Sequence, residues 1–337
     1  MPRYGLPYKG SKNGIAKWVV DQLPSATNLY DLFGGGGAIT HRAVEVGRWD
    51  NIYYNDINPR VIQLFQDAVA GKYREEKRWI SREDFFALKD TDYYVALCWS
   101  FGNNCKDYLY SKQIEPYKKA LHYARVLGDV SLLRQMGIDG DGSRLWISKH
   151  KDEVRKALAQ ITPPIECVSS TIAQSQGSEA LCGVQHLERS QGLQGLQGLE
   201  QLESLERSQG LQGLEQLESL ERSQGLQGLH YCSKSYDEFT FEDNSVIYCD
   251  IPYSKTDAPY VKGFDHDKFY AWCEQQTQLT IISEYNMLQD RFTTIAYKPK
   301  SILASNTGDI GKVTEKLFVP NHQLQLWNDM KRIKTFF

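Results

Sequence analysis

The sequence lacks the patterns that mark most zinc sites, disulfide-rich folds and membrane spans. Its seven cysteines are scattered and none forms a CxxC pair, which argues against a structural zinc site. An odd and dispersed set of cysteines is typical of reduced thiols, so we expect a cytoplasmic protein. No apolar run reaches the roughly 18 residues that would span a bilayer. The polar stretch 1–12 does not resemble a signal peptide.

Histidine and charge patterns exclude further classes of function. The seven histidines are dispersed without an HExxH pair, and we therefore predict no metal site. We also find no acidic cluster of the kind that restriction nucleases use. The formal net charge of -3 excludes a globally basic coat, so any nucleic-acid binding needs a local basic surface. A hydrophobic fraction of 41% over 337 residues suits one large globular domain, or a domain with a second lobe.

Strand and helix patterns alternate at both ends of the chain. Near the start we expect a helix over 13–23, a strand over 28–33, a helix over 38–46, a strand over 51–57 and a helix over 59–71. Further strands are expected over 245–253, 279–286, 301–306 and 313–320, with a helix over 264–276. Because parallel strands need such helical crossovers, the pattern predicts a doubly wound α/β sheet.

Two internal segments depart from this pattern. Residues 83–165 are rich in aromatic and basic side chains and predict a mostly helical lobe. Residues 187–229 repeat the block ERSQGLQGLEQLESL with leucine at every third position. That period does not suit an α-helix, because the leucines would spiral around it. It does not suit a strand either, because successive leucines would alternate between its two faces. A loosely ordered insertion, a protruding helix and a solenoid-like coil all remain open.

The segment YDLFGGGGA (30–38) predicts a ligand-binding turn after the first strand. Glycines allow the backbone to approach a bound molecule, because no Cβ intervenes. The helix that follows offers free N–H groups to an anionic group. The segment is not GxGxxG in a nicotinamide context, so hydride transfer is unsupported. A glycine turn without a ligand is the alternative.

Two later segments carry acidic residues at strand ends. Asp56 follows the second strand, where a carboxylate accepts hydrogen bonds from ribose hydroxyls, although it is also placed to cap the next helix. Asp250 begins the segment DIPY after a buried strand. A carboxylate there, with a backbone carbonyl, accepts both hydrogens of a base amino group and makes its nitrogen nucleophilic. Tyr253 is suited to stack on an extruded base, and Pro252 stiffens the turn.

These segments, in this order, resemble the Dam-type DNA adenine-N6 methyltransferases, particularly phage-encoded orphan members. The resemblance also includes PYKGSK (7–12), SYD (235–237), ISEY (282–285) and EKLFV (315–319). It covers most of 1–100 and 230–320, with the cofactor half before the catalytic half, as in the α group. The family usually has proline where Ile251 stands. That position contributes mainly backbone, so isoleucine can serve there.

The resemblance implies a Rossmann-like methyltransferase sheet with helices on both faces, formed by residues 1–82 and 230–337. It implies a DNA-recognition insert over 83–165, with the leucine-rich repeat inserted over 187–229. S-adenosyl-L-methionine is the implied cofactor. The implied substrate is double-stranded DNA, from which the target adenine is extruded. The implied cofactor residues are Tyr8, Lys12, Phe33, Gly35, Gly37, Asp56, Ile57, Tyr236 and Asp250, and the implied catalytic residues are Asp250, Pro252 and Tyr253.

The segment SFGNNCKDYLYSKQ (100–113) resembles the start of the family's recognition insert. Asn103 and Asn104 are candidates for hydrogen bonds to base edges. Candidates for phosphate contacts are Lys106, Lys112, Lys118, Lys119 and Arg125. The alternative is that these are turn asparagines and ordinary solvated helix charges.

Two other functions remain open at this point. Related tetrapeptides bind glutamine side chains, which makes a protein glutamine or amine methyltransferase an alternative. Ile251 and the repeat also allow a DNA-binding homologue with impaired catalysis. An orphan role in a bacterial or phage-infected cell, such as protection of phage DNA from host restriction-modification, rests on the resemblance alone.

Overall fold

The fold is described from a computed structural model, which describes residues 4–150, 153, 156, 228–252, 264–303 and 310–333. The chain divides into two units, each treated by itself below. The first contains the described residues up to Glu75 and from Gly228 onward, and the second contains those from Glu76 to Lys156. Most of the repeat 187–229 lies outside the described residues.

A seven-stranded sheet forms the centre of the first unit, in the order β3-β2-β1-β4-β5-β7-β6. β1, β2, β3, β4 and β5 run parallel, while β7 is antiparallel to both of its neighbours. The strand order reverses between β1 and β4, and this reversal creates a crevice at the carboxyl ends of these strands. The bounds are β1 (Asn28–Asp31), β2 (Asn51–Asn55), β3 (Leu229–Cys232), β4 (Ser245–Cys249), β5 (Leu279–Glu284), β6 (Phe292–Leu303) and β7 (Ile310–Pro320).

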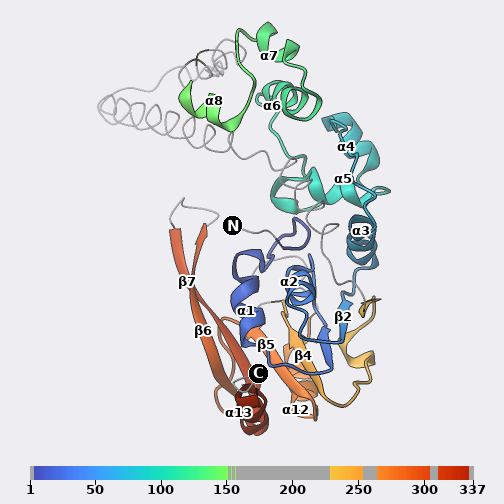
Figure 1. Ribbon diagram of the computed structural model, residues 1–337, viewed down its shortest axis with the longest axis vertical. Helices are drawn as coiled ribbons and strands as arrows, with labels where there is room; N and C mark the ends of the chain where they lie inside the picture. The colour runs from blue at the N-terminus through green and yellow to red at the C-terminus, as the bar shows by residue number, and fades with distance from the viewer. Residues whose placement is uncertain are drawn as a thin grey trace, which may run out of the picture. The chain divides into compact units, whose positions relative to one another are not determined.

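Helices cover both faces of the sheet (Figure 1). Leu29 packs with α1 and α2 on one face, and the next residue, Tyr30, packs with α12 on the other. This alternation follows from the two-residue period of a strand. The α/β fold predicted from the sequence is confirmed. The helices are α1 (Ala16–Gln22), α2 (Ala38–Val46), α3 (Pro59–Val69), α12 (His266–Glu274) and α13 (Leu324–Ile333), with 3-10 turns η1 (Asn13–Ile15), η4 (Tyr236–Glu238) and η5 (Asn321–Gln323).

The second unit is helical throughout its described regular elements, and it has its own apolar core around Tyr117, Leu121 and Leu133. Its helices are short, and several have side-chain caps, such as the capping box between Ser81 and Asp84. The helices are α4 (Arg82–Leu88), α5 (Tyr93–Cys98), α6 (Glu115–His122), α7 (Ser131–Gln135) and α8 (Arg144–Lys149), with a 3-10 turn η2 (Phe101–Asn103) and a π-helical turn η3 (Tyr123–Leu127).

The structure differs from the sequence expectations at two places. Leu229, expected as the end of the repeat, begins β3, and its neighbour Gly228 accepts the N–H of Ile52 at 2.7 Å. A Cβ at Gly228 would lie 2.0 Å from the carbonyl oxygen of Asp50, which explains the glycine. The closing strands also differ: β6 begins at Phe292 rather than at 301, and β7 at Ile310 rather than at 313, while 304–306 lie outside the described residues. The two strands form one antiparallel hairpin at the sheet edge (Figure 1). In the parts of the chain that the structure describes, none of the helices has the length and apolarity to cross a membrane.

Candidate active site

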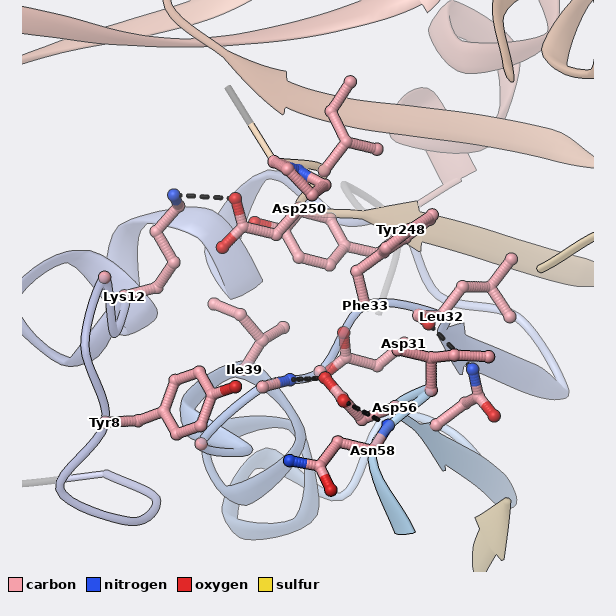
Figure 2. A pocket seen from close by; sticks show the side chains of 18 of the residues that line it. Tyr8, Lys12, Asp31, Leu32, Phe33, Ile39, Asp56, Asn58, Tyr248 and Asp250 are labelled. Carbon is pink, nitrogen blue, oxygen red and sulfur yellow. Dashed lines mark hydrogen bonds and ion pairs between the residues drawn. The ribbon is translucent and has the colours of Figure 1, made fainter. Parts of the chain in front are cut away.

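A cavity of about 740 Å³ opens at the carboxyl ends of β1, β2 and β4. Its position is the crevice created by the reversal of strand order, which is where open α/β sheets bind ligands. Segments far apart in the sequence meet there (Figure 2). The lining includes Tyr8, Lys12, Asp31, Phe33, Gly35, Asp56, Ile57, Tyr236, Asp250, Ile251, Pro252 and Tyr285.

The glycine loop between β1 and α2 forms one wall of the cavity. Gly35 lines it with φ of +50°, and a Cβ there would lie 3.2 Å from the Tyr8 ring. The N-terminal segment therefore packs directly on the loop, and the N–H of Leu6 also bonds to the carbonyl of Gly36 at 2.6 Å. Gly37, expected to line the cofactor loop, is not among the cavity residues. It starts α2 with φ of +71°, and a Cβ there would lie 2.3 Å from Phe65.

Asp56 fixes this loop to the end of β2. Its carboxylate accepts the N–H of Gly35 at 3.0 Å and the N–H of Asn58 at 2.8 Å. Burial raises the pKa of Asp56, although these two donors oppose the shift. Asn58, rather than Asp56, caps α3, because its side chain accepts the N–H of Arg60 at 3.1 Å. The capping role considered for Asp56 from the sequence therefore falls on Asn58.

Asp250 stands at the opposite side of the cavity, directly after β4. Its carboxylate lies 2.7 Å from the ammonium of Lys12, as Figure 2 shows. Lys12 is 5% exposed, and its Nζ also lies 3.5 Å from Glu315 of β7. Burial alone would lower the pKa of Lys12, but the two carboxylates outweigh it and the pKa is raised. The structure thus brings together Lys12 and Asp250, which the sequence separates by most of the chain.

The segment DIPY (250–253) differs from expectation at Ile251. Its side chain is 2% exposed and packs in the apolar cluster with Leu32, Cys249 and Phe269. The position therefore contributes a buried side chain as well as backbone. The carbonyl of Pro252 accepts a hydrogen bond from Nε2 of His266 at 2.8 Å, which anchors the turn to α12. Tyr253 lies outside the described residues.

Aromatic rings line the cavity near the segment DIPY (250–253). Phe33 packs against Tyr236 with ring centroids 5.6 Å apart, and against Phe264 at 5.7 Å. Ile57 contributes an apolar side chain that is 71% exposed at the mouth. Such a surface suits the face of a planar heterocycle.

Several residues that shape this cavity were missed by the sequence analysis. Asp31 is 1% exposed, accepts the hydroxyl of Thr40 at 2.7 Å, and has a pKa raised by burial to about 7. The sequence could have identified Asp31, because it is an acidic residue at the carboxyl end of the first strand. Asn55 joins three strand ends, donating to the carbonyls of Leu32 and Lys234. Nothing in the sequence near Glu315 points to a partner at residue 12.

The second unit places the predicted base-reading asparagines in a tightly bonded loop. Asn103 has φ of +55° and donates to the carbonyl of Leu97 at 3.0 Å. Asn104 accepts the N–H groups of Lys106 and Asp107 and donates to the Asp107 carboxylate at 2.9 Å. Both amides therefore shape the loop in this structure, which favours the turn-asparagine alternative for the chain in the absence of DNA.

The predicted phosphate-binding cations fall into two groups. Lys106, Lys112 and Lys119 are exposed. Lys118 is 4% exposed, with its ammonium over the ring of Tyr110, and burial lowers its pKa to about 7. This placement differs from the expectation that Lys118 contacts a phosphate. Arg125 is half-buried, and its Nε donates to the carbonyl of Gly142.

Among the residues that the structure describes, no group of three or more histidine, cysteine or acidic side chains is placed to hold a metal ion. A search of curated proteins finds no match to the chain. Residues 8–133 match a family model described as D12 class N6 adenine-specific DNA methyltransferase. The match includes Lys12, the glycine loop and Asp56, and ends before Asp250. It indicates an enzyme that methylates the N6 amino group of adenine in DNA.

Proposed function

We propose that this chain transfers a methyl group from S-adenosylmethionine to N6 of an adenine extruded from double-stranded DNA, in the manner of Dam-type enzymes. The observation that carries the proposal is the position of Asp250. It ends β4 at one side of the cavity, and the glycine loop with Asp56 forms another side. A carboxylate and a cofactor loop in one cavity are what amino-group methylation requires.

The cavity residues fit this cofactor. Asp56 is placed to accept hydrogen bonds from ribose hydroxyls, and Ile57 with the aromatic rings of the cavity suits an adenine ring. Tyr8, Lys12, Phe33 and Gly35 complete the wall that would hold the methionine part.

The chemistry assigned to the chain concerns protons and charge on the base. The bound cofactor supplies a methyl group already activated by a sulfonium. Asp250 accepts one hydrogen of the adenine amino group, and a backbone carbonyl of the following turn accepts the other. Both bonds localise the nitrogen lone pair and stabilise the positive charge that develops there. His266, bound to the carbonyl of Pro252, holds that turn in place.

Base extrusion and DNA contact are assigned to the second unit together with residues near the cavity. Tyr253 would stack on the extruded base. Exposed Lys106, Lys112 and Lys119 would contact phosphates. The boundaries of the insert, 83–165, and of the repeat, 187–229, remain our proposal for how the chain is divided.

The test is methyl transfer from labelled S-adenosylmethionine to unmethylated duplex DNA, followed by nucleoside analysis. We expect N6-methyladenine with the wild-type chain and none above background with Asp250→Asn, which keeps size but removes the charge. Thermal unfolding is the control for folding of the variant, and calorimetry measures cofactor binding by the wild-type chain. Cofactor binding without transfer would replace the proposal with a non-catalytic DNA-binding role. Transfer to protein instead of DNA would favour the alternative of a protein glutamine or amine methyltransferase.

A further inference from the structure

A buried carboxylate on the last strand shares the ammonium partner of Asp250. Glu315 of β7 is 0% exposed, and its Oε1 lies 3.5 Å from Nζ of Lys12. The same oxygen accepts the hydroxyl hydrogen of Ser283 at 2.8 Å. Glu315 lies outside the stretch 8–133 that matches the family model, and the reaction outlined above uses it for no step.

The sheet register explains why Glu315 lies near Lys12. Glu284, the last residue of β5, pairs with Lys316 of β7. Glu315 precedes Lys316 in β7, and because the two strands are antiparallel its backbone lies just past the carboxyl end of β5. Ser283 and Glu315 thus come from adjacent strands. The carboxyl ends of the parallel strands hold Asp250, and β7 brings a second carboxylate to the same edge.

Lys12 faces groups from three directions. They are Asp250 after β4 at 2.7 Å, Glu315 of β7 at 3.5 Å, and Tyr285 directly after β5. The two carboxylates raise the pKa of the ammonium against the effect of burial. Lys12 therefore stays charged at neutral pH, and it is closer to Asp250 than to Glu315.

The ion pair engages Oδ1 of Asp250. An amino hydrogen of the base that approaches this same oxygen competes with the ammonium of Lys12 for it. Separating a buried ion pair leaves an uncompensated charge, which is costly. Glu315 is placed to take over the charge of Lys12 without movement of the backbone, because its oxygen is already 3.5 Å away.

We propose that Glu315 is a positioning residue that retains the Lys12 ammonium when Asp250 exchanges it for the amino group of the target base. This inference rests on the proposed function. No covalent change occurs at Glu315. Ser283 orients its carboxylate through the hydroxyl hydrogen bond. Lys12 thereby moves between two carboxylates, and Asp250 is released for catalysis only when Glu315 is charged.

The variant Glu315→Gln tests the role, since its amide oxygen can still accept the hydroxyl of Ser283 while the charge is lost. We expect kcat to fall about 10-fold to 100-fold, with KM for DNA changed by less than about 3-fold, because base docking is intact. The alkaline limb of the kcat profile should move to lower pH, since Lys12 loses one of the anions that raise its pKa. Glu315→Asp keeps the charge and should restore part of kcat.

A second readout uses the free protein and needs no activity. The pKa of Lys12 is measured by NMR with lysine labelled at Nζ, and Lys12→Met identifies the resonance. Glu315→Gln should lower this pKa by about one unit or more. Glu284→Gln is the matched control: Glu284 is 2% exposed on the neighbouring strand and accepts the N–H of Tyr285 at 2.6 Å. It should leave the pKa of Lys12 within about 0.3 units.

An unchanged Lys12 pKa in Glu315→Gln overturns the inference, and so does an unchanged kcat and pH profile. A loss of kcat equal in Glu315→Gln and Glu284→Gln would also overturn it, because general destabilisation then accounts for the effect. If the wild-type chain transfers no methyl group to DNA, the proposed function fails. The NMR titration still decides whether Glu315 holds Lys12, so the two failures are distinguishable.

Discussion

The carboxylate of Asp56 accepts the backbone N–H of Gly35 at 3.0 Å, although the two residues belong to different strand-end loops. Its other oxygen accepts the N–H of Asn58 at 2.8 Å. One side chain thus holds both the glycine loop and the start of α3. The same carboxylate lines the cavity, so loop geometry and ligand contact depend on one residue.

Asp56→Ala should weaken cofactor binding through this dual role. Hydrogen bonds to a charged group contribute about 1.5–3 kcal/mol, which corresponds to a rise in Kd for S-adenosylmethionine of about 10-fold to 100-fold. Isothermal titration calorimetry measures the change. Asp243→Ala, which removes an exposed carboxylate of the same unit, is the control and should leave Kd unaltered. Equal affinities in both variants would remove Asp56 from the cofactor site.

Asp31 should make stability depend on pH. Burial, with Asp250 and Asp56 nearby, raises its pKa from 3.8 to about 7, and the hydrogen bond from Thr40 opposes the shift. The folded chain therefore keeps a proton that the unfolded chain has lost. This contribution to stability is fully present below about pH 4 and is lost as the pH rises through about 7.

Asp31→Asn removes this dependence and keeps an acceptor for Thr40. Between pH 5 and pH 8, the wild type should lose roughly a few kcal/mol more unfolding free energy than the variant. Urea unfolding at both pH values measures the difference. Parallel pH dependence in the two proteins would show that Asp31 is ionised throughout this range.

Ile251 should behave as a core residue. Its side chain is 2% exposed within an apolar cluster. Ile251→Ala is expected to lower the unfolding free energy by about 2–5 kcal/mol, and Ile251→Val by about 0.5–1.5 kcal/mol. Ile251→Pro fills less of the site, so we expect it to be less stable and no more active. A stable and more active proline variant would mean that turn rigidity outweighs the packing.

We expect the exposed and the buried lysines of the second unit to differ in their contribution to DNA binding. Lys112→Met should weaken binding and reduce the slope of log K against log salt by about 1, if this exposed ammonium contacts a phosphate. Lys118→Met should leave both unchanged, because its ammonium is buried over Tyr110. Fluorescence anisotropy at several salt concentrations provides the data. A reduced slope for Lys118→Met would show that the buried lysine becomes exposed on DNA.

Local pattern predicted the elements of the sheet well. The helix expected over 38–46 is α2 with the same bounds, and the strand expected over 245–253 contains β4. The glycine loop also followed from local chemistry, whereas the cap of α3 falls on Asn58 and not on Asp56. β3 was missed because it has four residues and begins at the last leucine of the repeat, and its pairing with β2 is visible only in three dimensions.

Residues of the site could be predicted from the sequence where they follow the end of a strand. They could not be predicted where they lie within a strand. Asp56 and Asp250 follow β2 and β4, and sequence position alone marks them. Glu315 lies within β7, and only the antiparallel register brings it to Lys12. The burial of Lys118 also escaped prediction, because tertiary packing selects which lysine of α6 turns inward.

The pairing of β1 with β4 determines when the sheet can form during synthesis of the chain. Asn28 pairs with Ser245, and their side chains form a hydrogen bond of 3.3 Å at a sequence separation of 217. Closing so long a loop is entropically expensive and slow. During translation, β1 and β2 therefore remain without the neighbouring strand β4 until the second unit has left the ribosome. The exposed strand edge in this interval is where a chaperone would be needed.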